Sequence, residues 1–375
     1  MKILFINLPF SGHIIPTLGL VQELIKRGHK ITYLLTPDWK EKILHTGAEF
    51  SEYQDNKKLS VQMRNAYDAA IKLAAGFDLV IYEQFFFLGK HAAEKFNMPA
   101  IRIFTSMASN ESIMKEFVNA GGMFGVFRSK WVCRQWTKEV AKGIELKTDC
   151  WLKEILHNPP ELNLVYTVRN FQPYAEDFKE ENYKFLGASI YQRVPDKPFA
   201  MPPKKYPLIY ISLGTIVNNA AAFYKKCIRA FEHENVQVIM SIGSLVSKDS
   251  LGKIPDNFSI YPFVPQLEVL ENTDIFITHG GMNSVTESLY YGVPMIVIPF
   301  MTDQPLNAKR IEELHLGKKL EYKNITSEII REATLSVMEN SSIRQQTLAM
   351  KKELRSKNAN ALGADIIDEY MSGYC

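Results

Sequence analysis

Short apolar runs alternate with amphipathic stretches along almost the whole chain of 375 residues. The first three segments, KILFINL, IIPTLGLVQELIKRG and HKITYLL, have the lengths and spacing of a strand, a helix and a second strand. Such alternation is typical of parallel sheets whose strands are joined by crossover helices. We therefore predict an α/β protein built from doubly wound sheets.

A proline- and lysine-rich stretch, YQRVPDKPFAMPPKKYP, interrupts this alternation and predicts an interdomain linker over residues 191–207. Strand-like runs such as LIYISLG and DIFITHGG resume after it, and a chain of this length suits two hydrophobic cores. We expect an N-terminal domain over residues 1–190, a C-terminal domain over residues 208–355, and an amphipathic terminal helix within residues 356–375.

The charge balance argues against a polyanionic partner. Forty-four Lys and Arg residues oppose 41 Asp and Glu residues, a net charge of +3, so nucleic acid is not expected as a partner. No apolar segment approaches the roughly 18 residues of a membrane span, and the apolar run at the N-terminus is a first strand rather than a signal peptide. A cytoplasmic protein is expected.

The cysteines show neither a CxxC pair nor the spacing of metal ligands. They are Cys133, Cys150, Cys227 and Cys375. This scatter favours free thiols in a reducing compartment over a disulfide framework. The histidines other than His13 and His279, among them His91, also lack metal-ligand spacing, and we expect them on the surface.

The stretch THGGMNSVTES places polar residues where a buried strand ends. Gly280 and Gly281 permit a tight turn, and Asn283 or Ser284 can begin the next helix. Because a helix N-terminus presents N–H groups and a partial positive charge, a diphosphate fits there without a metal ion, and His279 can donate a further hydrogen bond. The alternative is an ordinary capped turn, which leaves the histidine without a role.

Four further features lie at or near strand ends. Glu287 follows Asn283 by one helical turn and can accept hydrogen bonds from ribose hydroxyls. Asp303 and Gln304 follow the apolar run PMIVIPF, where they can hold sugar hydroxyls. The stretch YPFVPQ offers an aromatic ring and an amide, and SLGT ends another strand with a glycine. The usual dinucleotide, P-loop, zinc-protease and serine-hydrolase motifs are missing from the chain, as is Asp-x-Asp.

Residues 263–304 resemble the nucleotide-sugar signature of the family 1 glycosyltransferases, inverting UDP-sugar enzymes of the bacterial macrolide and plant secondary-product types. The matching elements are aromatic-x-P-Q, T-H-x-G-x-N-S-x-x-E, G-V-P-M and D-Q, and SGHIIP near the start matches the GH-x-x-P of the family. The resemblance implies the GT-B fold, with two facing Rossmann-like domains, an interdomain cleft and a last helix that returns to the N-terminal domain.

The resemblance also implies a UDP-sugar as co-substrate, with no metal or other cofactor. In the family, the residues at these positions stack on uracil, contact the phosphates, bind the ribose or hold the transferred sugar. The nucleotide-sugar residues carried over in this way are Thr215, Phe263, Gln266, His279, Gly281, Asn283, Ser284, Glu287, Asp303 and Gln304. Gln304 favours glucose as the transferred sugar by resemblance alone.

His13 matches the general base of the family, and we expect it just before a helix that begins near Pro16. The family orients this histidine with an aspartate, but Glu83 stands in that place. The extra methylene leaves open whether the carboxylate reaches the imidazole or is only a strand-end group.

The acceptor pocket of the family is formed by the N-terminal domain, here by residues such as Phe85, Phe86, Ser106 and Phe127. An apolar, aromatic lining favours a small lipophilic alcohol or phenol, although these residues could equally belong to the core.

The predicted function is transfer of a hexose, glucose by resemblance, from a UDP-sugar to such an acceptor. One alternative is a membrane-surface glycosyltransferase that makes glycolipids, for which residues 127–136 supply basic and aromatic side chains. A second is a nucleotide-sugar epimerase, and a third is a binding module without turnover. Membrane association is the less favoured possibility, and both a monomer and a homodimer fit the sequence.

Overall fold

The computed structural model describes residues 1–73, 75–191, 199–214 and 220–374. The chain divides into two compact units. Unit 1 comprises Met1–Tyr191 and Lys357–Cys375, and unit 2 comprises Gln192–Ser356. Thr215, one of the predicted phosphate contacts, and residues 192–198 of the predicted linker lie outside the described residues.

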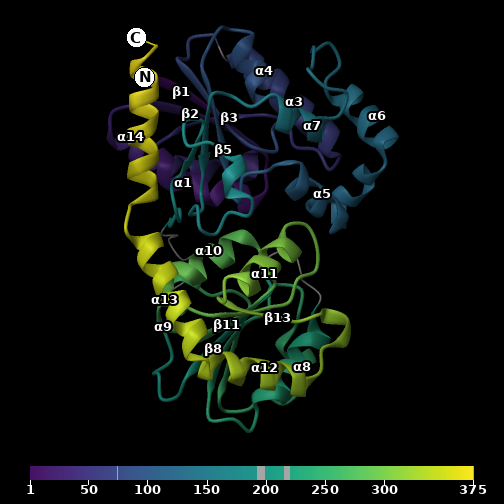
Figure 1. Ribbon diagram of the computed structural model, residues 1–375, viewed down its shortest axis with the longest axis vertical. Helices are drawn as coiled ribbons and strands as arrows, with labels where there is room; N and C mark the ends of the chain where they lie inside the picture. Colours follow the sequence, from purple (N-terminus) through teal and green to yellow (C-terminus); the bar gives the residue numbers. More distant parts are fainter. Residues whose placement is uncertain (74, 192–198, 215–219, 375) are drawn as a thin grey trace. The chain divides into compact units, whose positions relative to one another are not determined.

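Within its described residues, unit 1 contains a seven-stranded parallel sheet in the order β3-β2-β1-β4-β5-β6-β7 (Figure 1). The strands are β1 (Lys2–Ile6), β2 (Lys30–Leu35), β3 (Glu49–Glu52), β4 (Leu79–Glu83), β5 (Ala100–Phe104), β6 (Leu162–Val165) and β7 (Tyr183–Phe185). The α-helices are α1 (Ser11–Lys26), α2 (Lys40–Leu44), α3 (Leu59–Leu73), α4 (Gly89–Glu94), α5 (Glu111–Asn119), α6 (Lys130–Val140), α7 (Trp151–His157) and α14 (Ala359–Ser372). Short 3-10 turns are η1 (Pro37–Trp39), η2 (Gly122–Arg128) and η3 (Ala175–Asp177).

Both faces of the unit 1 sheet are buried. Successive side chains of β1 alternate between two hydrophobic clusters, with Leu4 and Ile6 in one and Ile3 and Phe5 in the other. This two-residue period, with apolar residues on both faces, is what a parallel sheet covered by helices requires. Each fully buried side chain of this size contributes about 2 kcal/mol to folding.

Helix α14 packs on α1 within unit 1 (Figure 1). The Arg27 guanidinium lies 2.7 Å from Asp365 and 3.1 Å from Asp368, and Nε2 of His29 lies 2.8 Å from Asp368. Gly19 of α1 lies so close to Asn360 that a Cβ at this glycine would come within 2.2 Å of the amide nitrogen. Apolar packing and ion pairs together hold the C-terminal helix on this unit.

Unit 2 has a second parallel sheet, six-stranded within its described residues, in the order β10-β9-β8-β11-β12-β13. Its strands are β8 (Leu208–Ser212), β9 (Gln237–Ser241), β10 (Phe258–Tyr261), β11 (Ile275–Thr278), β12 (Met295–Val297) and β13 (Gly317–Lys319). Its α-helices are α8 (Ala221–Phe231), α9 (Gln266–Asn272), α10 (Met282–Tyr291), α11 (Gln304–Glu313), α12 (Ser327–Glu339) and α13 (Ser341–Arg355), and its 3-10 turns are η4 (Lys248–Leu251) and η5 (Tyr322–Asn324). The predicted doubly wound α/β architecture is confirmed.

The cysteine prediction was wrong for one pair. Cys133 of α6 and Cys150, which precedes α7, form a disulfide with a Cα–Cα distance of 5.6 Å. The spacing rules that argued against a disulfide concern metal sites and redox motifs, whereas pairing depends on the path of the chain between the two residues. Cys227 is free and buried within α8.

The prediction of a surface position was wrong for His91. Its side chain is buried, and Nε2 lies 3.0 Å from Glu154, a carboxylate that is itself buried. Burial raises the pKa of Glu154, but hydrogen bonds from His91, Thr148 and the backbone N–H of Lys147 outweigh that effect and lower the pKa to about 2. This buried pair fastens α7 to α4.

Candidate active site

In both sheets, strand order reverses at one position, and at these positions Glu83 ends a strand and His13 and His279 follow strands. In unit 1, β1 lies between β2 and β4, so the connections after β1 and β4 diverge. In unit 2, the equivalent divergence occurs between β8 and β11. The carboxyl ends of the strands at such a switch point leave a crevice in which ligands bind in open α/β sheets.

His13 lies in the first turn of α1, directly after the β1 loop. The helix begins at Ser11 rather than near Pro16. Pro16 cannot donate a backbone hydrogen bond within the helix, but the burial of the apolar side of α1 stabilises the helix by more than this loss costs. Glu83 is the last residue of β4, the neighbour of β1. The topological switch thus brings together two residues that are 70 positions apart.

The His13 imidazole and the Glu83 carboxylate are in direct contact. Nδ1 of His13 lies 2.7 Å from Oε1 of Glu83, and Oε2 accepts a hydrogen bond of 3.0 Å from the backbone N–H of Phe85. The Thr105 hydroxyl lies 3.3 Å from both Nδ1 of His13 and Oε1 of Glu83. The Glu83 side chain is fully buried, whereas that of His13 is 24% exposed. A carboxylate fixed in this way holds the imidazole ring in one orientation.

Aromatic rings flank this pair. The Phe85 ring contacts His13 edge-on, with centroids 5.0 Å apart, and Phe10 contacts it from 5.7 Å. Phe85 also packs against Phe117 and Phe124. These contacts place a largely apolar surface around a partly exposed histidine, which suits an apolar molecule that carries a hydroxyl group.

One of the predicted acceptor residues does not fit that role. Phe86 has no exposed surface and belongs to the core, so its assignment as a wall of an acceptor pocket is corrected. Phe127 is also buried, with its ring against Trp136 and Trp151. Ser106 is half-buried and accepts a hydrogen bond of 3.2 Å from the Gln84 amide.

In unit 2, His279, Gly280 and Gly281 form the turn between β11 and α10. A Cβ placed on Gly214 would come within 2.6 Å of Cε1 of His279, and one on Gly281 would come within 2.6 Å of Nε2. The His279 ring therefore lies between the backbone at Gly214 and the backbone at Gly281. A side chain at either position would collide with the ring. Gly281 is the N-cap of α10 and provides no side-chain acceptor, so Asn283 and Ser284 lie inside the first turn rather than at the cap.

The electrostatics of this turn favour an anion. Burial lowers the pKa of His279 to about 4, and the nearby Asp303 opposes this shift only in part. The imidazole is therefore neutral near pH 7, and it can donate one N–H bond without carrying a buried charge. Helix α10 directs its N-terminus, with the partial positive charge of its dipole, at the same turn.

Gln266 and Glu287 form a hydrogen-bonded pair beside the turn. The Gln266 amide nitrogen donates to Oε2 of Glu287 over 2.6 Å and lies 3.4 Å from the Ser284 hydroxyl. Oε1 of Gln266 accepts a bond of 3.2 Å from the Tyr210 hydroxyl. Phe263 lies three residues before Gln266 in the sequence, and it is 61% exposed. An exposed ring beside a carboxylate–amide pair is an arrangement that can bind a base and a ribose.

The loop after β12 presents Asp303. Its Oδ2 atom accepts bonds of 3.3 Å from the Met282 N–H and 2.9 Å from the Asn307 amide, and Oδ1 accepts a bond of 3.0 Å from Thr302. Gln304 is buried, and its Oε1 accepts bonds from the backbone N–H groups of Phe300 and Met301. Gln304 thus shapes the loop, whereas Asp303 lies half-buried at its tip.

Three residues outside the predicted nucleotide-sugar and catalytic sets belong to these groups. Thr105 bridges the His13–Glu83 pair, Asn307 ties Asp303 to the carbonyl oxygen of Gly280, and Gly214 makes room for the His279 ring. The spacing of four residues between Asp303 and Asn307 on one helix face is a signal that could have identified Asn307.

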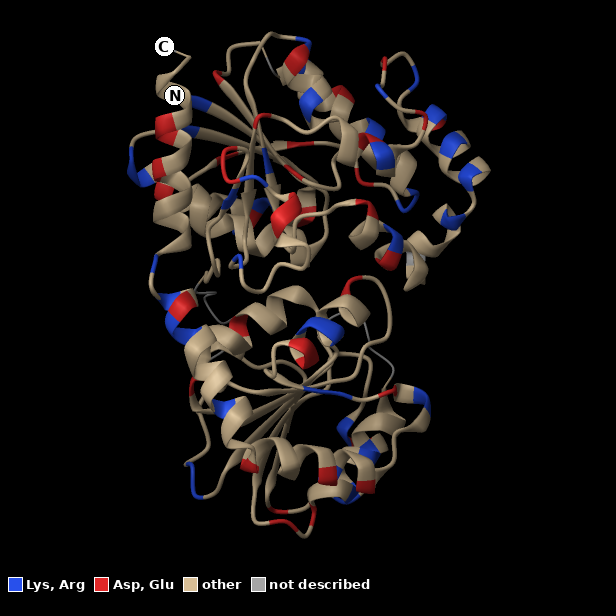
Figure 2. Cartoon of the chain, in the orientation of Figure 1, with Lys and Arg blue, Asp and Glu red and all other residues tan. Residues whose placement is uncertain are grey.

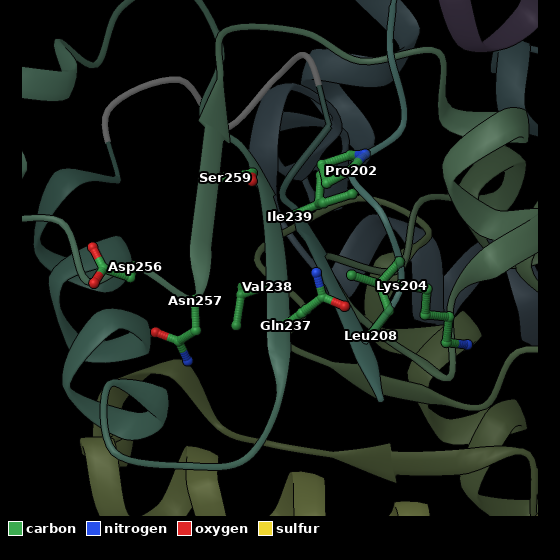
Figure 3. Close-up of a pocket in the computed structure, with 9 residues that line it drawn as sticks. All are labelled: Pro202, Lys204, Leu208, Gln237, Val238, Ile239, Asp256, Asn257 and Ser259. Atoms are coloured by element: carbon green, nitrogen blue, oxygen red, sulfur yellow. The ribbon is translucent and has the colours of Figure 1, made fainter. Parts of the chain in front are cut away.

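A hollow of about 40 Å³ in unit 2 lies at the opposite edge of the sheet, where β8, β9 and β10 begin (Figure 3). Three of its polar side chains are engaged within the chain. Lys204 lies 2.7 Å from Asp274, Gln237 accepts the N–H groups of Lys205 and Tyr206, and the Asn257 amide donates to backbone carbonyls. The hollow has room for a few water molecules but not for a nucleotide sugar.

Among the described residues, no group of three or more His, Cys, Asp or Glu side chains is placed to hold a metal ion. The helices in the described ranges also include none that is long and apolar enough to cross a bilayer.

Comparison with known proteins identifies the family. Residues 202–357 match the family model described as UDP-glucoronosyl and UDP-glucosyl transferase. The NDP-glycosyltransferase YjiC of Bacillus licheniformis is 33% identical, over 98% of this chain and 96% of the relative. The oleandomycin glycosyltransferase of Streptomyces antibioticus is 26% identical, over 95% of this chain and 88% of the relative.

The solved structure of CalG4, the calicheamicin glycosyltransferase, has a TM-score of 0.82 at 28% identity and covers 99% of this chain and 98% of its own. The structure of the glycosyltransferase of kitacinnamycin has a TM-score of 0.81 at 26% identity, over 98% of each chain. The family and the GT-B fold expected from the motifs are both confirmed. The chain belongs to the family 1 UDP-glycosyltransferases and is a glycosyltransferase enzyme.

Proposed function

We propose that this glycosyltransferase transfers glucose from UDP-glucose to a hydroxyl group of a small lipophilic acceptor, with inversion at the anomeric carbon and with His13 as the general base. The observation that carries the proposal is the contact of 2.7 Å between Nδ1 of His13 and the buried Glu83 carboxylate. This contact supplies the oriented histidine that acceptor activation requires.

The hydrogen bond fixes the roles of the two ring nitrogens. When Nδ1–H donates to Glu83, Nε2 is the basic nitrogen and takes the proton of the acceptor hydroxyl. The acceptor oxygen forms a bond to the anomeric carbon while the bond from that carbon to the UDP oxygen breaks, and UDP leaves with the electron pair. The Glu83 carboxylate then stabilises the imidazolium that results. A base placed in this way accelerates the transfer by roughly 10²- to 10⁴-fold.

Unit 2 supplies the donor site in this proposal. Phe263 stacks on the uracil, Glu287 and Gln266 bind the ribose, and His279, Gly281, Asn283 and Ser284 contact the diphosphate. Asp303 contacts the sugar, and Gln304 holds the loop that presents it. Because the N-terminus of α10 and a neutral donor face the leaving group, the proposed reaction needs no divalent cation, and EDTA should leave the rate unchanged.

The acceptor class follows from the rings around His13. Phe10 and Phe85 contact the base, and Phe117 packs against Phe85, so the surroundings of His13 suit a natural product with a phenol or alcohol group. Relatives named for oleandomycin and calicheamicin support this class of acceptor.

The test is a panel of phenols, flavonoids, macrolides and sterols incubated with UDP-glucose, UDP-galactose and TDP-glucose. Mass spectrometry should show a gain of one hexose on at least one acceptor with UDP-glucose, and the proton NMR spectrum should show a β-glucoside. A product with the α-configuration, or no product with any pairing of donor and acceptor, would contradict the proposal.

A further inference from the structure

The segment that comprises η2, α6 and the two residues after α6 concentrates positive charge. Residues 122–142 contain five Lys or Arg residues and one acidic residue, a net charge of +4, whereas the whole chain has a net charge of +3. Figure 2 shows the basic positions recurring along α6. The remainder of the protein is therefore close to neutral, and this segment accounts for the net positive charge of the chain.

The inward face of α6 is fixed to unit 1. Cys133, Thr137 and Val140 are buried, Cys133 is joined to Cys150, and the Trp136 ring packs against Trp151. The opposite face carries exposed cations at intervals of four residues, which aligns them in one stripe along the helix. The cations of the stripe are Lys130, Arg134 and Lys138, and a fourth exposed cation, Lys142, lies two residues beyond the end of the helix.

Most of this charge is not neutralised within the chain. Among the described residues, Lys130, Lys138 and Lys142 have no ion-pair partner, whereas Arg134 contacts Asp149. The one acidic residue of the segment, Glu139, lies 2.6 Å from Lys58, a cation from outside the segment, so it does not offset the stripe.

Two large apolar side chains project from the same segment. Trp131 is 69% exposed and Val126 is 57% exposed. Neither is needed for the core, because the neighbouring Phe127 and Trp136 make the ring contacts with Trp151. An exposed tryptophan beside a stripe of cations matches the chemistry of a bilayer interface, where the indole enters the headgroup region and the cations meet anionic lipids. A polyanion such as nucleic acid would use the cations but not Val126.

We propose that this surface, which we call the α6 surface and define as Val126, Arg128, Lys130, Trp131, Arg134, Lys138 and Lys142, docks unit 1 on an anionic phospholipid bilayer. We infer a bilayer because its anionic headgroups complement the cations of this surface and its interface accepts the exposed apolar side chains. The docking is independent of the proposed acceptor and of His13.

The experiment is flotation of the full chain with vesicles of phosphatidylcholine alone or with 30% phosphatidylglycerol. At low salt the wild type should float with the anionic vesicles and not with the neutral ones. The pair Lys130→Glu/Lys138→Glu should weaken partitioning about tenfold or more, because each cation near an anionic surface strengthens binding by roughly fivefold. Trp131→Ala should weaken it several-fold, and 0.5 M salt should release the protein.

The controls come from the exposed surface of unit 2. Leu245→Ala removes an apolar side chain that is 70% exposed, and Lys248→Glu/Lys253→Glu makes the same change of charge. Both should float like the wild type, and circular dichroism should show that every variant is folded. The proposal is overturned if the wild type ignores anionic vesicles, or if the two control variants lose binding as much as the α6 variants. A third result would also overturn it: soluble heparin binds as tightly as the anionic vesicles do, and Trp131→Ala changes neither the affinity for heparin nor the affinity for vesicles. The surface would then be a general polyanion site.

Discussion

The Nδ1 atom of His13 lies 2.7 Å from Oε1 of Glu83, although Glu83 has one methylene more than the aspartate usual at this position in the family. Three hydrogen-bond donors surround the carboxylate of this longer side chain and hold it in position. The backbone N–H of Phe85 binds Oε2, and the Thr105 hydroxyl joins His13 at Oε1. The carboxylate is therefore held in place even though the side chain has an additional rotatable bond.

Glu83→Gln tests this relationship. The amide has the shape of the carboxylate but not its charge, so it can no longer stabilise the imidazolium formed during transfer. We expect kcat to fall by roughly 10- to 1,000-fold, with little change in the KM for UDP-glucose. The matched control is Glu111→Gln, a glutamate whose side chain is 82% exposed, which should leave kcat unchanged. An active Glu83→Gln variant would show that the contact is only structural.

Gly281→Ala tests the close packing around His279. Gly281 has an ordinary φ of −62°, so alanine adds no backbone strain, but its Cβ would lie 2.6 Å from Nε2 of His279. The ring must move, and the KM for UDP-glucose should rise about tenfold or more because a misplaced donor loses its hydrogen bond to the phosphate. Gly125→Ala is the control, since a Cβ there meets nothing within 4 Å. An unchanged KM would remove His279 from the donor site.

The buried His279 predicts how stability changes with pH. Its pKa of about 4 in the folded protein lies below its ordinary value of 6.5, so the unfolded chain takes up the proton first as the pH falls. Stability is therefore retained above pH 6.5 and falls by about 3 kcal/mol as the pH drops from 6.5 to 4. Chemical denaturation between pH 4 and 8 measures this, and His279→Asn should flatten the slope. An equal slope in the variant would assign the effect to other groups.

The Cys133–Cys150 disulfide should stabilise unit 1. It closes a loop between residues 17 positions apart, for which the chain-entropy model gives about 3 kcal/mol. Adding a reductant should lower the Tm of the wild type. The double variant Cys133→Ser/Cys150→Ser should unfold at the lower temperature with or without the reductant. If the reductant leaves the wild type unchanged, the disulfide does not contribute to its stability.

The sequence was sufficient for the fold and for the types of residue at the strand ends of each unit. Alternating apolar runs predicted the parallel sheets, and polar residues at strand ends located His13, Glu83 and His279 at the switch points. These features are local, because they depend on periodicity and on which residue follows a strand.

The remaining features depend on how distant segments pack. Phe85 and Phe86 are adjacent and chemically identical, yet only Phe85 contacts His13, because the turn after β4 directs the Phe86 ring into the core. The pairing of Cys133 with Cys150 and the burial of His91 follow from the positions of α6 and α7 against the sheet, which no spacing rule supplies.

His13→Ala removes the proposed general base. Product formation should be followed by mass spectrometry and UDP binding by calorimetry, with His233→Ala as a control because that side chain is 91% exposed. If His13 is the base, transfer should fall by roughly 10²- to 10⁴-fold while UDP binding and the Tm remain those of the wild type. Transfer at the wild-type rate in His13→Ala would contradict this role of His13.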